Sequence, residues 1–564
     1  MFPRITEKAK EGIGGVVDTV KGDKDLRLVQ HASTFAGAND GPANTAARVA
    51  GVQPGAGRDD APYFTSNEGL PWPTPSRSLT AGGLPVVSDI FLMQKQQAFN
   101  RAKTVERMVH PCGSAAFGYF EVTHDVSDLT KAAFMNSVGK KTAVFTRFST
   151  VTYGREFPDE GRNPRGFAVK FYTEEGNYDM VGLNWPVFFV RDPMKGPDNI
   201  RSQQRDPASF LINYNAWFDF LANNPESNHA GMMLMSDHGT PVGWRFMHGY
   251  GCHTFKWVNS DGKATYVKYH FICEGETKEF TWDEAVKMCG EDPDYSKRDL
   301  WTHIEKGGEC AWVMNVQTMT VEEAENPSLD FDPFDVTKVW PKGKYPLRPV
   351  GRLVLNRNPE NYHRDVEQSA FSPGSMVPGI EPSPDMLLQF RSFFYRDAQY
   401  HRLGINLHQI PVNCPFMSKS YSTVNFDGAL RADANHGGNP PYGQTSLPCP
   451  AFRPDADFHE MKLPDNIVSR ASRFRHEGSE SEYTQPRELY SRVMTPQQRK
   501  NLHYNTACVL KLASPSIQEN YLAQCYAIHP DYASGIYELL AEPEFKMDAV
   551  AAKAKKAHLV GLNL

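Results

Sequence analysis

The sequence predicts an α+β protein built on an antiparallel β-barrel core and completed by a helical C-terminal domain. Short runs of β-branched and aromatic residues recur between about residues 116 and 275, separated by Gly, Asp and Asn turns. Residues 358–450 are dense in Pro, Asn and Gly, and helix-start signals follow after about residue 495. At 564 residues the chain is long enough for one large core with one or two further domains.

Each expected barrel strand is a run of apolar, aromatic and β-branched residues between two turn signals. The expected strands are 116–124, 143–151, 166–172, 186–190, 251–258, 265–272, 312–320 and 352–355. Runs spaced in this way are typical of antiparallel sheets joined by short turns, and so they favour a barrel.

Three regions are expected along the chain: an N-terminal arm and linker (1–62), a core (63–450) and a C-terminal helical domain (451–564). Residues 35–62 are rich in Gly, Ala, Asp and Pro, which is typical of a linker. Residues 3–21 form a weak amphipathic pattern, which favours a solvated or partner-docking arm over a membrane-binding helix.

Local motifs mark the two ends of this plan. The run Pro71-Trp-Pro-Thr-Pro predicts an extended arm at the start of the core. In the C-terminal domain, Thr495 is placed as an N-cap, with a proline next to it and Gln498 at the third helical position. Further helices are expected at 515–527 and 531–541.

Bulk properties exclude several classes of function. The net charge of -6 and the pI near 6.3 provide no basic footprint for nucleic acid. No run of about 18 apolar residues is present, so no membrane span is expected. The N-terminus lacks an apolar signal segment, and the nine cysteines are scattered without a CxxC motif, so we expect an intracellular protein with reduced thiols.

The run from Arg391 to Tyr395 carries the chemistry most clearly. Tyrosine is a known proximal ligand of haem iron, which it binds as a phenolate. Residues four apart share one helix face, and a nearby guanidinium favours the charged form of a phenol. Far upstream, the run from Phe99 to His110 offers an imidazole for the opposite face of the haem. The pattern therefore predicts a ferric, Tyr-ligated haem with His110 across from it.

These two segments resemble the signatures of the haem catalases. Residues 99–115 fit the distal catalase signature at every fixed position. Residues 391–399 fit the haem-ligand signature except at Phe394, where catalases carry a small residue. Further matches run from about residue 63 to about residue 540. The resemblance implies a catalase fold with haem b, a threading arm and a wrapping segment, and hence a homo-oligomer, either a dimer or a tetramer.

The resemblance also assigns roles to individual residues. It makes His110 the distal acid and base, with Ser149 against the far nitrogen of its ring. The arginines that would clamp the haem propionates, through bidentate pairs, are Arg107, Arg147 and Arg402. The side chains that would wall the pocket are Val151, Phe167 and Phe188.

Two positions of the distal pocket depart from the family. Leu183 stands where catalases carry the asparagine that helps to hold and polarise peroxide, so a preformed dipole is lost. Gly196 stands where catalases carry a phenylalanine that guards the inner channel. The pocket is expected to be more apolar and roomier, which suits an organic ligand better than peroxide. The alternative is neutral drift in an active catalase.

The NADPH groove of the family is altered as well. His238 replaces an arginine and Ile272 replaces a lysine, and these two cations would grip the 2′-phosphate. NADPH binding is therefore doubtful. The positions that still match the groove are His229, Ser236, Tyr250 and Trp340.

Three functions are compatible with these residues. One is a catalase that disproportionates hydrogen peroxide. The second, which we favour, is a catalase-like oxidase that resembles the chanoclavine-I synthases of fungal ergot-alkaloid pathways. That resemblance implies oxidative cyclisation of a small-molecule substrate, prechanoclavine, to chanoclavine-I with dioxygen or superoxide. The third, a haem-binding protein without catalysis, is opposed by the His110–Ser149 pair.

The last residues bear on the location of the protein in the cell. The chain ends in Asn563-Leu564, whereas Ser-Lys-Leu is the standard peroxisomal terminus. Some peroxisomal catalases also end in Asn-Leu, so the peroxisome is favoured over the cytosol.

Overall fold

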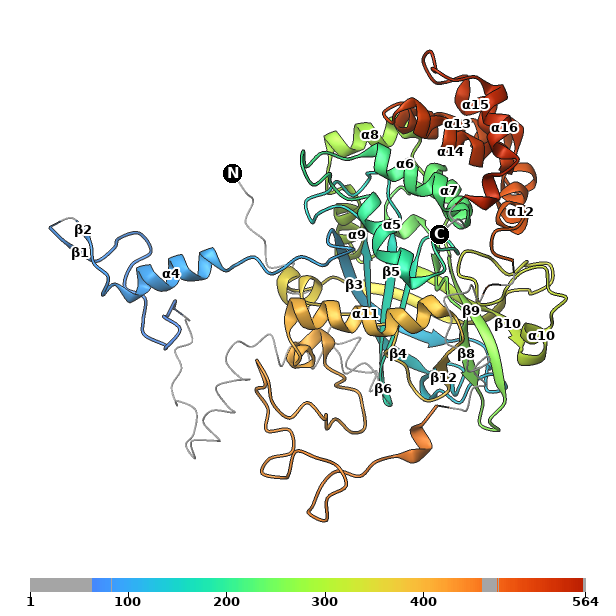
Figure 1. The fold of residues 1–564 in the computed structure, drawn as a ribbon. Helices are drawn as coiled ribbons and strands as arrows, with labels where there is room; N and C mark the ends of the chain where they lie inside the picture. The colour runs from blue at the N-terminus through green and yellow to red at the C-terminus, as the bar shows by residue number, and fades with distance from the viewer. Residues whose placement is uncertain (1–62, 83, 459–473, 475, 561–564) are drawn as a thin grey trace. The chain divides into compact units, whose positions relative to one another are not determined.

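The computed structural model describes residues 63–82, 84–458, 474 and 476–560 (Figure 1). The expected N-terminal arm and linker and the terminal Asn563-Leu564 lie outside the described residues, as does the amphipathic pattern at 3–21. The described residues up to Glu106 belong to one compact unit, and those from Arg107 onward belong to another.

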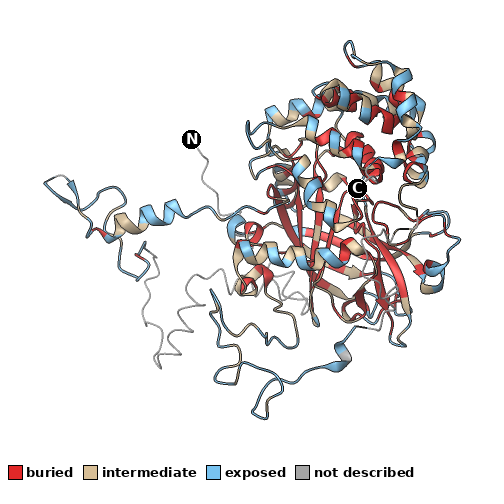
Figure 2. Ribbon diagram, viewed as in Figure 1, coloured by how far each residue is buried: buried red, intermediate tan, exposed pale blue. Residues whose placement is uncertain are grey.

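The first unit is an arm with little internal core. It contains a hairpin of β1 (Thr80–Ala81) and β2 (Leu84–Pro85), followed by α4 (Ile90–Asn100). Asp89 caps α4 by accepting a hydrogen bond from the Leu92 amide at 3.1 Å. None of the residues of α4 is buried (Figure 2). A helix gains most of its stability from packing, so α4 lacks that support within its own unit.

The second unit is built on an antiparallel barrel, as the sequence predicted. In the described chain, eight strands follow the order β10-β11-β3-β4-β5-β6-β7-β9, and pairing between β9 and β10 closes the ring. The strands of the ring are β3 (Gly113–Val122), β4 (Lys141–Ser149), β5 (Gly166–Thr173), β6 (Gly176–Leu183), β7 (Gly249–Tyr250), β9 (Ala264–Cys273), β10 (Cys310–Thr320) and β11 (Arg348–Arg357). The strands β8 (Phe255–Val258) and β12 (Ile380–Pro382) extend the sheet beyond β9. Closure leaves no unpaired edge along most of the ring.

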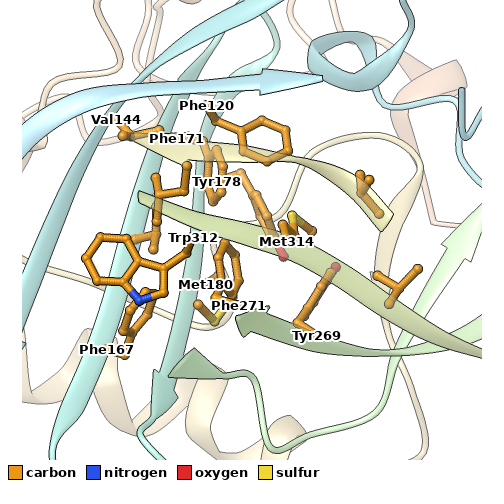
Figure 3. Close-up of a cluster of buried hydrophobic side chains, with 14 of the residues drawn as sticks. Phe120, Val144, Phe167, Phe171, Tyr178, Met180, Tyr269, Phe271, Trp312 and Met314 are labelled. Carbon is orange, nitrogen blue, oxygen red and sulfur yellow. The ribbon is translucent and has the colours of Figure 1, made fainter. Parts of the chain in front are cut away.

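Large apolar side chains fill the barrel interior (Figure 3). Phe167 and Trp312 lie edge to face with ring centroids 5.5 Å apart, and both are fully buried. Almost every residue of β4 is buried, because one strand face points into the barrel and the other is covered by the rest of the unit. This double burial explains why the strands read as continuous apolar runs in the sequence.

The predicted strand at 186–190 is wrong. This segment is irregular, and the Phe188 amide donates to the Val336 carbonyl at 3.0 Å outside any ladder. Pro186 has no amide hydrogen to contribute to a ladder. The strand in this part of the chain is β6, whose Gly, Asn and Asp residues concealed it. The strand predicted at 251–258 is also shorter than expected, since β8 begins only at Phe255.

Helices cover the barrel and form the C-terminal part (Figure 1). Those inserted within and after the barrel strands are α5 (Gly196–Ser202), α6 (Tyr214–Asn223), α7 (Asn228–Met235), α8 (Trp282–Glu291), α9 (Tyr295–Glu305), α10 (Val321–Glu325) and α11 (Met386–Leu403). Those of the C-terminal part are α12 (Ser481–Glu488), α13 (Pro496–Leu510), α14 (Pro515–Ile528), α15 (Pro530–Tyr537) and α16 (Met547–Ala554). The N-cap predicted at Thr495 is confirmed as a capping box with Gln498. None of the described helices is both long and apolar enough to cross a membrane.

A buried ion cluster joins the C-terminal helices to the rest of the unit. Arg191 Nη2 donates to both carboxylate oxygens of Glu482, at 2.8 and 2.7 Å. The same arginine lies 3.4 Å from Glu226 and 3.3 Å from Asp335, and Lys338 reaches Glu482 at 2.7 Å. All of these charges are buried, so each depends on its partners for compensation.

Replacement of Glu482 should therefore destabilise the protein. Glu482→Gln leaves Lys338 without its carboxylate and Arg191 with one partner fewer, so we expect a loss of about 3–5 kcal/mol in the free energy of unfolding. Urea unfolding followed by circular dichroism measures the loss. Glu480→Gln is the matched control, because its carboxylate is exposed and lies 3.6 Å from Arg487. Equal stability of the two variants would contradict the expectation.

Candidate functional site

Helix α11 brings Arg391 and Tyr395 together. Asp385 caps the helix by accepting a hydrogen bond from the Leu388 amide at 3.0 Å, and Gly404 ends it with φ at +96°. Arg391 Nη2 donates to Tyr395 Oη at 2.7 Å, and the guanidinium carbon lies 4.8 Å from the ring centroid. The phenol oxygen therefore lies beside a fixed positive charge.

His110 precedes β3 in an unusual backbone conformation. Its φ is +65°, in the left-handed region that a non-glycine residue seldom adopts. Arg147 stabilises this bend by donating from Nη1 to the His110 carbonyl at 2.8 Å and from Nη2 to the Pro111 carbonyl at 3.1 Å. The imidazole Nδ1 lies 2.9 Å from Ser149 Oγ, at the end of β4.

The ring of His110 is held in its neutral form. Desolvation lowers the pKa of His110 to about 3, and the cations Arg147, Arg391 and Arg107 contribute further. One ring nitrogen is engaged by Ser149, while Nε2 has no hydrogen bond to any described residue. A neutral imidazole with one free nitrogen can accept a proton and return it.

Three arginines crowd one side of the same site. Arg107, Arg147 and Arg402 are buried, and desolvation lowers the pKa of each; the repulsion of neighbouring guanidinium groups adds to the effect at Arg107 and Arg402. Glu367 lies 3.6 Å from Arg107 and supplies one opposing charge. Arg107 Nη1 and Arg147 Nε have no hydrogen-bond partner among the described residues. Buried cationic donors of this kind match an anionic ligand.

Two adjoining cavities, of about 170 and 60 Å³, are lined by both His110 and Tyr395. The residues that line both are Met108, Val109, His110, Val181, Gly182, Phe394 and Tyr395. Of the other predicted residues, the larger cavity is lined by Val151, Leu183, Phe188, Gly196 and Arg391. The smaller one is lined by Arg107, Arg147, Ser149, Phe167 and Arg402. The structure thus brings all the predicted haem-site residues to one place.

These residues fit a haem. A phenol with an adjacent guanidinium and an imidazole both line the cavities, and the unpartnered guanidinium nitrogens suit two propionates. Both departures from the family also line the larger cavity. Leu183 pairs with Gly166 in the β5–β6 ladder. Gly166 itself lies against the imidazole of His110, since a Cβ built on it would lie 2.6 Å from Nδ1. A Cβ built on Gly196 would have no atom within 4 Å, so this part of the cavity is open.

A buried pair that sequence reasoning missed also belongs to the site. His253 Nδ1 lies 2.8 Å from Asp385 Oδ2, and His253 lines the larger cavity. Burial lowers the pKa of His253 and outweighs the opposing effect of Asp385. The two residues are 132 positions apart, and no spacing rule connects them. The one available signal was the cap position of Asp385 before the Tyr395 helix.

Two of the positions compared with the NADPH groove of the family lie together. His238 and Tyr250 line a separate cavity of about 110 Å³, and His229, Ser236 and Trp340 are not among the residues that line it. His238 Nδ1 lies 2.6 Å from Glu279 Oε1, and this carboxylate also lines the cavity. A negative charge thus lies beside the position where the family has a phosphate-binding arginine.

An antiparallel barrel that carries a Tyr–Arg pair opposite a buried His–Ser pair defines a class of haem oxidoreductases. The catalase family model matches residues 65–448, and a model described as catalase-related immune-responsive matches residues 476–540. The chain belongs to the catalase family. It is therefore an enzyme, an oxidoreductase of a family that normally binds haem.

Similar proteins come from distant organisms. A catalase of Methanosarcina barkeri is 44% identical over 85% of this chain and 94% of its own. A peroxisomal catalase of Candida tropicalis is 41% identical over 86% of this chain and 99% of its own. The solved structure of catalase A from Saccharomyces cerevisiae matches with a TM-score of 0.80 and 39% identity, over 85% of this chain and 98% of that chain.

Gly166 should be required for the contact between His110 and Ser149. A Cβ at this position would lie 2.5 Å from Ser149 Oγ and 2.6 Å from His110 Nδ1. Gly166→Ala should displace the imidazole and lower peroxide turnover by about 10²-fold, since general acid–base catalysis contributes at least this much. Haem content should stay unchanged. Gly290→Ala is the control, because a Cβ there meets nothing within 4 Å. Unaltered turnover in Gly166→Ala would contradict this role.

Proposed function

We propose that this protein is a haem-dependent oxidoreductase that carries out an oxidative cyclisation of an organic substrate and has reduced activity toward hydrogen peroxide. The observation that carries this proposal is Leu183, an apolar side chain in the wall of a largely apolar distal cavity. Gly196 opens space in the same cavity. An apolar cavity with a few convergent polar groups is typical of a site for an organic ligand.

Two sets of residues would hold haem b. Tyr395 would bind the iron, and Arg391 would stabilise the phenolate. Arg107, Arg147 and Arg402 would pair with the propionates. When bound, the haem supplies the redox chemistry of the site.

Residues of the chain would carry out proton transfer and exclude water. His110 would accept a proton at Nε2 and return it, while Ser149 keeps the imidazole in one orientation. At the position of Leu183 no dipole is available to polarise peroxide, which would lower peroxide turnover. The cavity wall formed by Val151, Phe167 and Phe188 would exclude water from the reacting groups.

For the substrate, we propose prechanoclavine, converted to chanoclavine-I by an oxidative, decarboxylative cyclisation that releases the carboxyl group as carbon dioxide, with dioxygen or superoxide as the oxidant. Support comes from the resemblance to chanoclavine-I synthases, in which the haem ligands are retained while the peroxide pocket is altered. The structure supports this indirectly, through an apolar cavity that combines an intact His110–Ser149 pair with Leu183 and Gly196.

A second candidate is an ordinary catalase that disproportionates hydrogen peroxide to water and oxygen. It is favoured by the relatives, which are named catalases and reach 47% identity over most of the chain. The neutral His110 beside Ser149 is compatible with this reaction too. Peroxide turnover near that of ordinary catalases would select this candidate.

NADPH should bind weakly or not at all. The groove presents the carboxylate of Glu279 and a histidine engaged with it, where a 2′-phosphate requires free cations. Ile272 adds no charge in place of the usual lysine.

We further propose a homo-oligomer, a dimer or tetramer, that works in the peroxisome. Helix α4 has no buried residue, so contact with another subunit would supply the packing it lacks. The peroxisomal location is supported by the peroxisomal catalases among the relatives, with the cytosol as the alternative. The division into 1–62, 63–450 and 451–564 also remains a prediction.

Haem binding should depend on Tyr395. In Tyr395→Phe the phenol oxygen is absent, so we expect the haem-to-protein ratio to fall from about one to near zero. The pyridine haemochrome assay measures this ratio. His110→Ala is the comparison, since it should keep haem yet lose about 10²–10⁴-fold in turnover. A high-spin ferric spectrum in Tyr395→Phe would remove Tyr395 from this role.

The polarity of the distal wall should control peroxide turnover. Leu183→Asn restores a dipole near His110, so peroxide dismutation should rise by up to about 10²-fold. Oxygen release measured with an electrode checks this. The proposal is weakened if the wild type already works at ordinary catalase rates and the variant is no faster.

The volume of the cavity should instead control the organic reaction. Gly196→Phe places a ring in open space, so it should impair conversion of prechanoclavine more than peroxide dismutation. Product formation followed by mass spectrometry, beside the oxygen assay, separates the two effects. Intact organic turnover in this variant would show that the larger cavity does not take the substrate.

A further inference from the structure

The larger cavity becomes polar where it meets α5. Asn199 and Gln203 both line it, and both are buried, with exposed fractions of 1% and 3%. Gln203 Nε2 donates to Asn199 Oδ1 at 3.2 Å and to the Asn199 carbonyl at 3.3 Å. Among the described residues, the amide nitrogen of Asn199 has no acceptor, so the buried pair still has a donor to offer a ligand.

Arg201 lies between these two amides in the chain and lines the same cavity from its exposed end. Within the described residues, its guanidinium has no hydrogen bond and no ion pair. The neighbouring Arg205 differs, because it stacks 5.6 Å from the Phe210 ring and does not line the cavity. Arg201 is thus an exposed cation in the cavity wall, without a partner among the described residues.

The charge balance of the cavity favours an anion. The described residues that line it include no Asp or Glu. Acidic side chains would otherwise neutralise Arg201 or repel a negatively charged ligand. The other arginine that lines this cavity, Arg391, differs from Arg201 because its guanidinium already donates to Tyr395.

Four phenylalanines contribute to the rest of the wall, which is otherwise largely aliphatic. Phe390 and Phe394 are one turn apart on α11, and their rings are stacked with centroids 6.0 Å apart and an angle of 24°. Phe188 and Phe189 also line the cavity, with their rings edge to face at 6.0 Å. A flat aromatic ligand can pack against faces and edges of this kind.

We propose that Arg201, with the Asn199–Gln203 amide pair, binds an anionic group of the organic substrate, so that the preferred substrates are aromatic carboxylates. The inference rests on the proposed function, since it places the organic substrate in this cavity. The carboxylate accepts hydrogen bonds from the guanidinium and from the free amide nitrogen of Asn199, while the ring packs against Phe188 and Phe189. Arg201 then determines specificity, and it takes no part in proton transfer.

Binding of two probes of equal shape and different charge tests this assignment. Isothermal titration of the haem-loaded protein with indole-3-acetate and with indole-3-acetamide gives both affinities. The wild type should bind the acetate more tightly, and its advantage should shrink as salt is raised. Arg201→Ala should weaken acetate binding by about three- to tenfold and leave the acetamide unchanged, in line with a partly exposed ion pair.

Three further variants complete the test. Arg205→Ala should change neither affinity, because that side chain is outside the cavity. Arg201→Lys should keep most of the preference for the acetate, whereas Asn199→Ala should weaken the binding of both probes alike.

Equal loss of affinity for both probes in Arg201→Ala, or no loss for either, overturns the anion site while the organic cavity stands. Failure of the wild type to bind either probe overturns the organic cavity and this inference together. Tight, charge-selective binding without any organic turnover would uphold the anion site and reject the proposed reaction.

Discussion

The hydrogen bonds from Arg147 to the backbone before β3 are the interaction on which the rest of the site depends. Its guanidinium bonds the carbonyls of His110 and Pro111 and so maintains the positive φ that turns the imidazole toward Ser149. The same side chain belongs to the buried group formed with Arg107 and Arg402. Arg147 in β4 therefore links two features of the site. It stabilises the backbone bend at His110, and it contributes to the buried positive charge that suits an anionic cofactor. Because Arg147 is buried, a substitution there would disturb both the backbone bend and the buried positive charge.

Two features of the scaffold show how the cavity lining can vary while the barrel stays the same. Leu183 ends β6 and keeps its ladder partners Gly166 and Tyr250, because backbone pairing is independent of the side chain. Gly196 begins α5 in open space, where no neighbour requires a large side chain. Both positions alter the cavity while the barrel is unaffected. The cavity lining and the barrel fold can therefore vary independently in this chain.

Much of the molecule could be predicted from the sequence, and the failures have physical causes. Barrel strands with buried faces were legible as apolar runs, and the Thr495 cap followed from local hydrogen bonding. The strand predicted at 186–190 was wrong because a buried segment is apolar even where its backbone is irregular. The site positions of His110 and Tyr395 came from signatures, since 285 residues separate them along the chain. The His253–Asp385 pair remained hidden because no local rule connects residues that meet only through the fold.

The ion cluster around Arg191 also holds the segment that leads into α5, one of the helices that line the larger cavity. Arg191 lies five residues before Gly196, so the segment that leads into the cavity-lining helix α5 is tied at its base to Glu482 in the C-terminal part. The barrel and Tyr395 make no use of this tie. The C-terminal helices thus brace the segment that leads into α5, so a substitution in this appended part can alter the cavity wall while every barrel strand keeps its sequence.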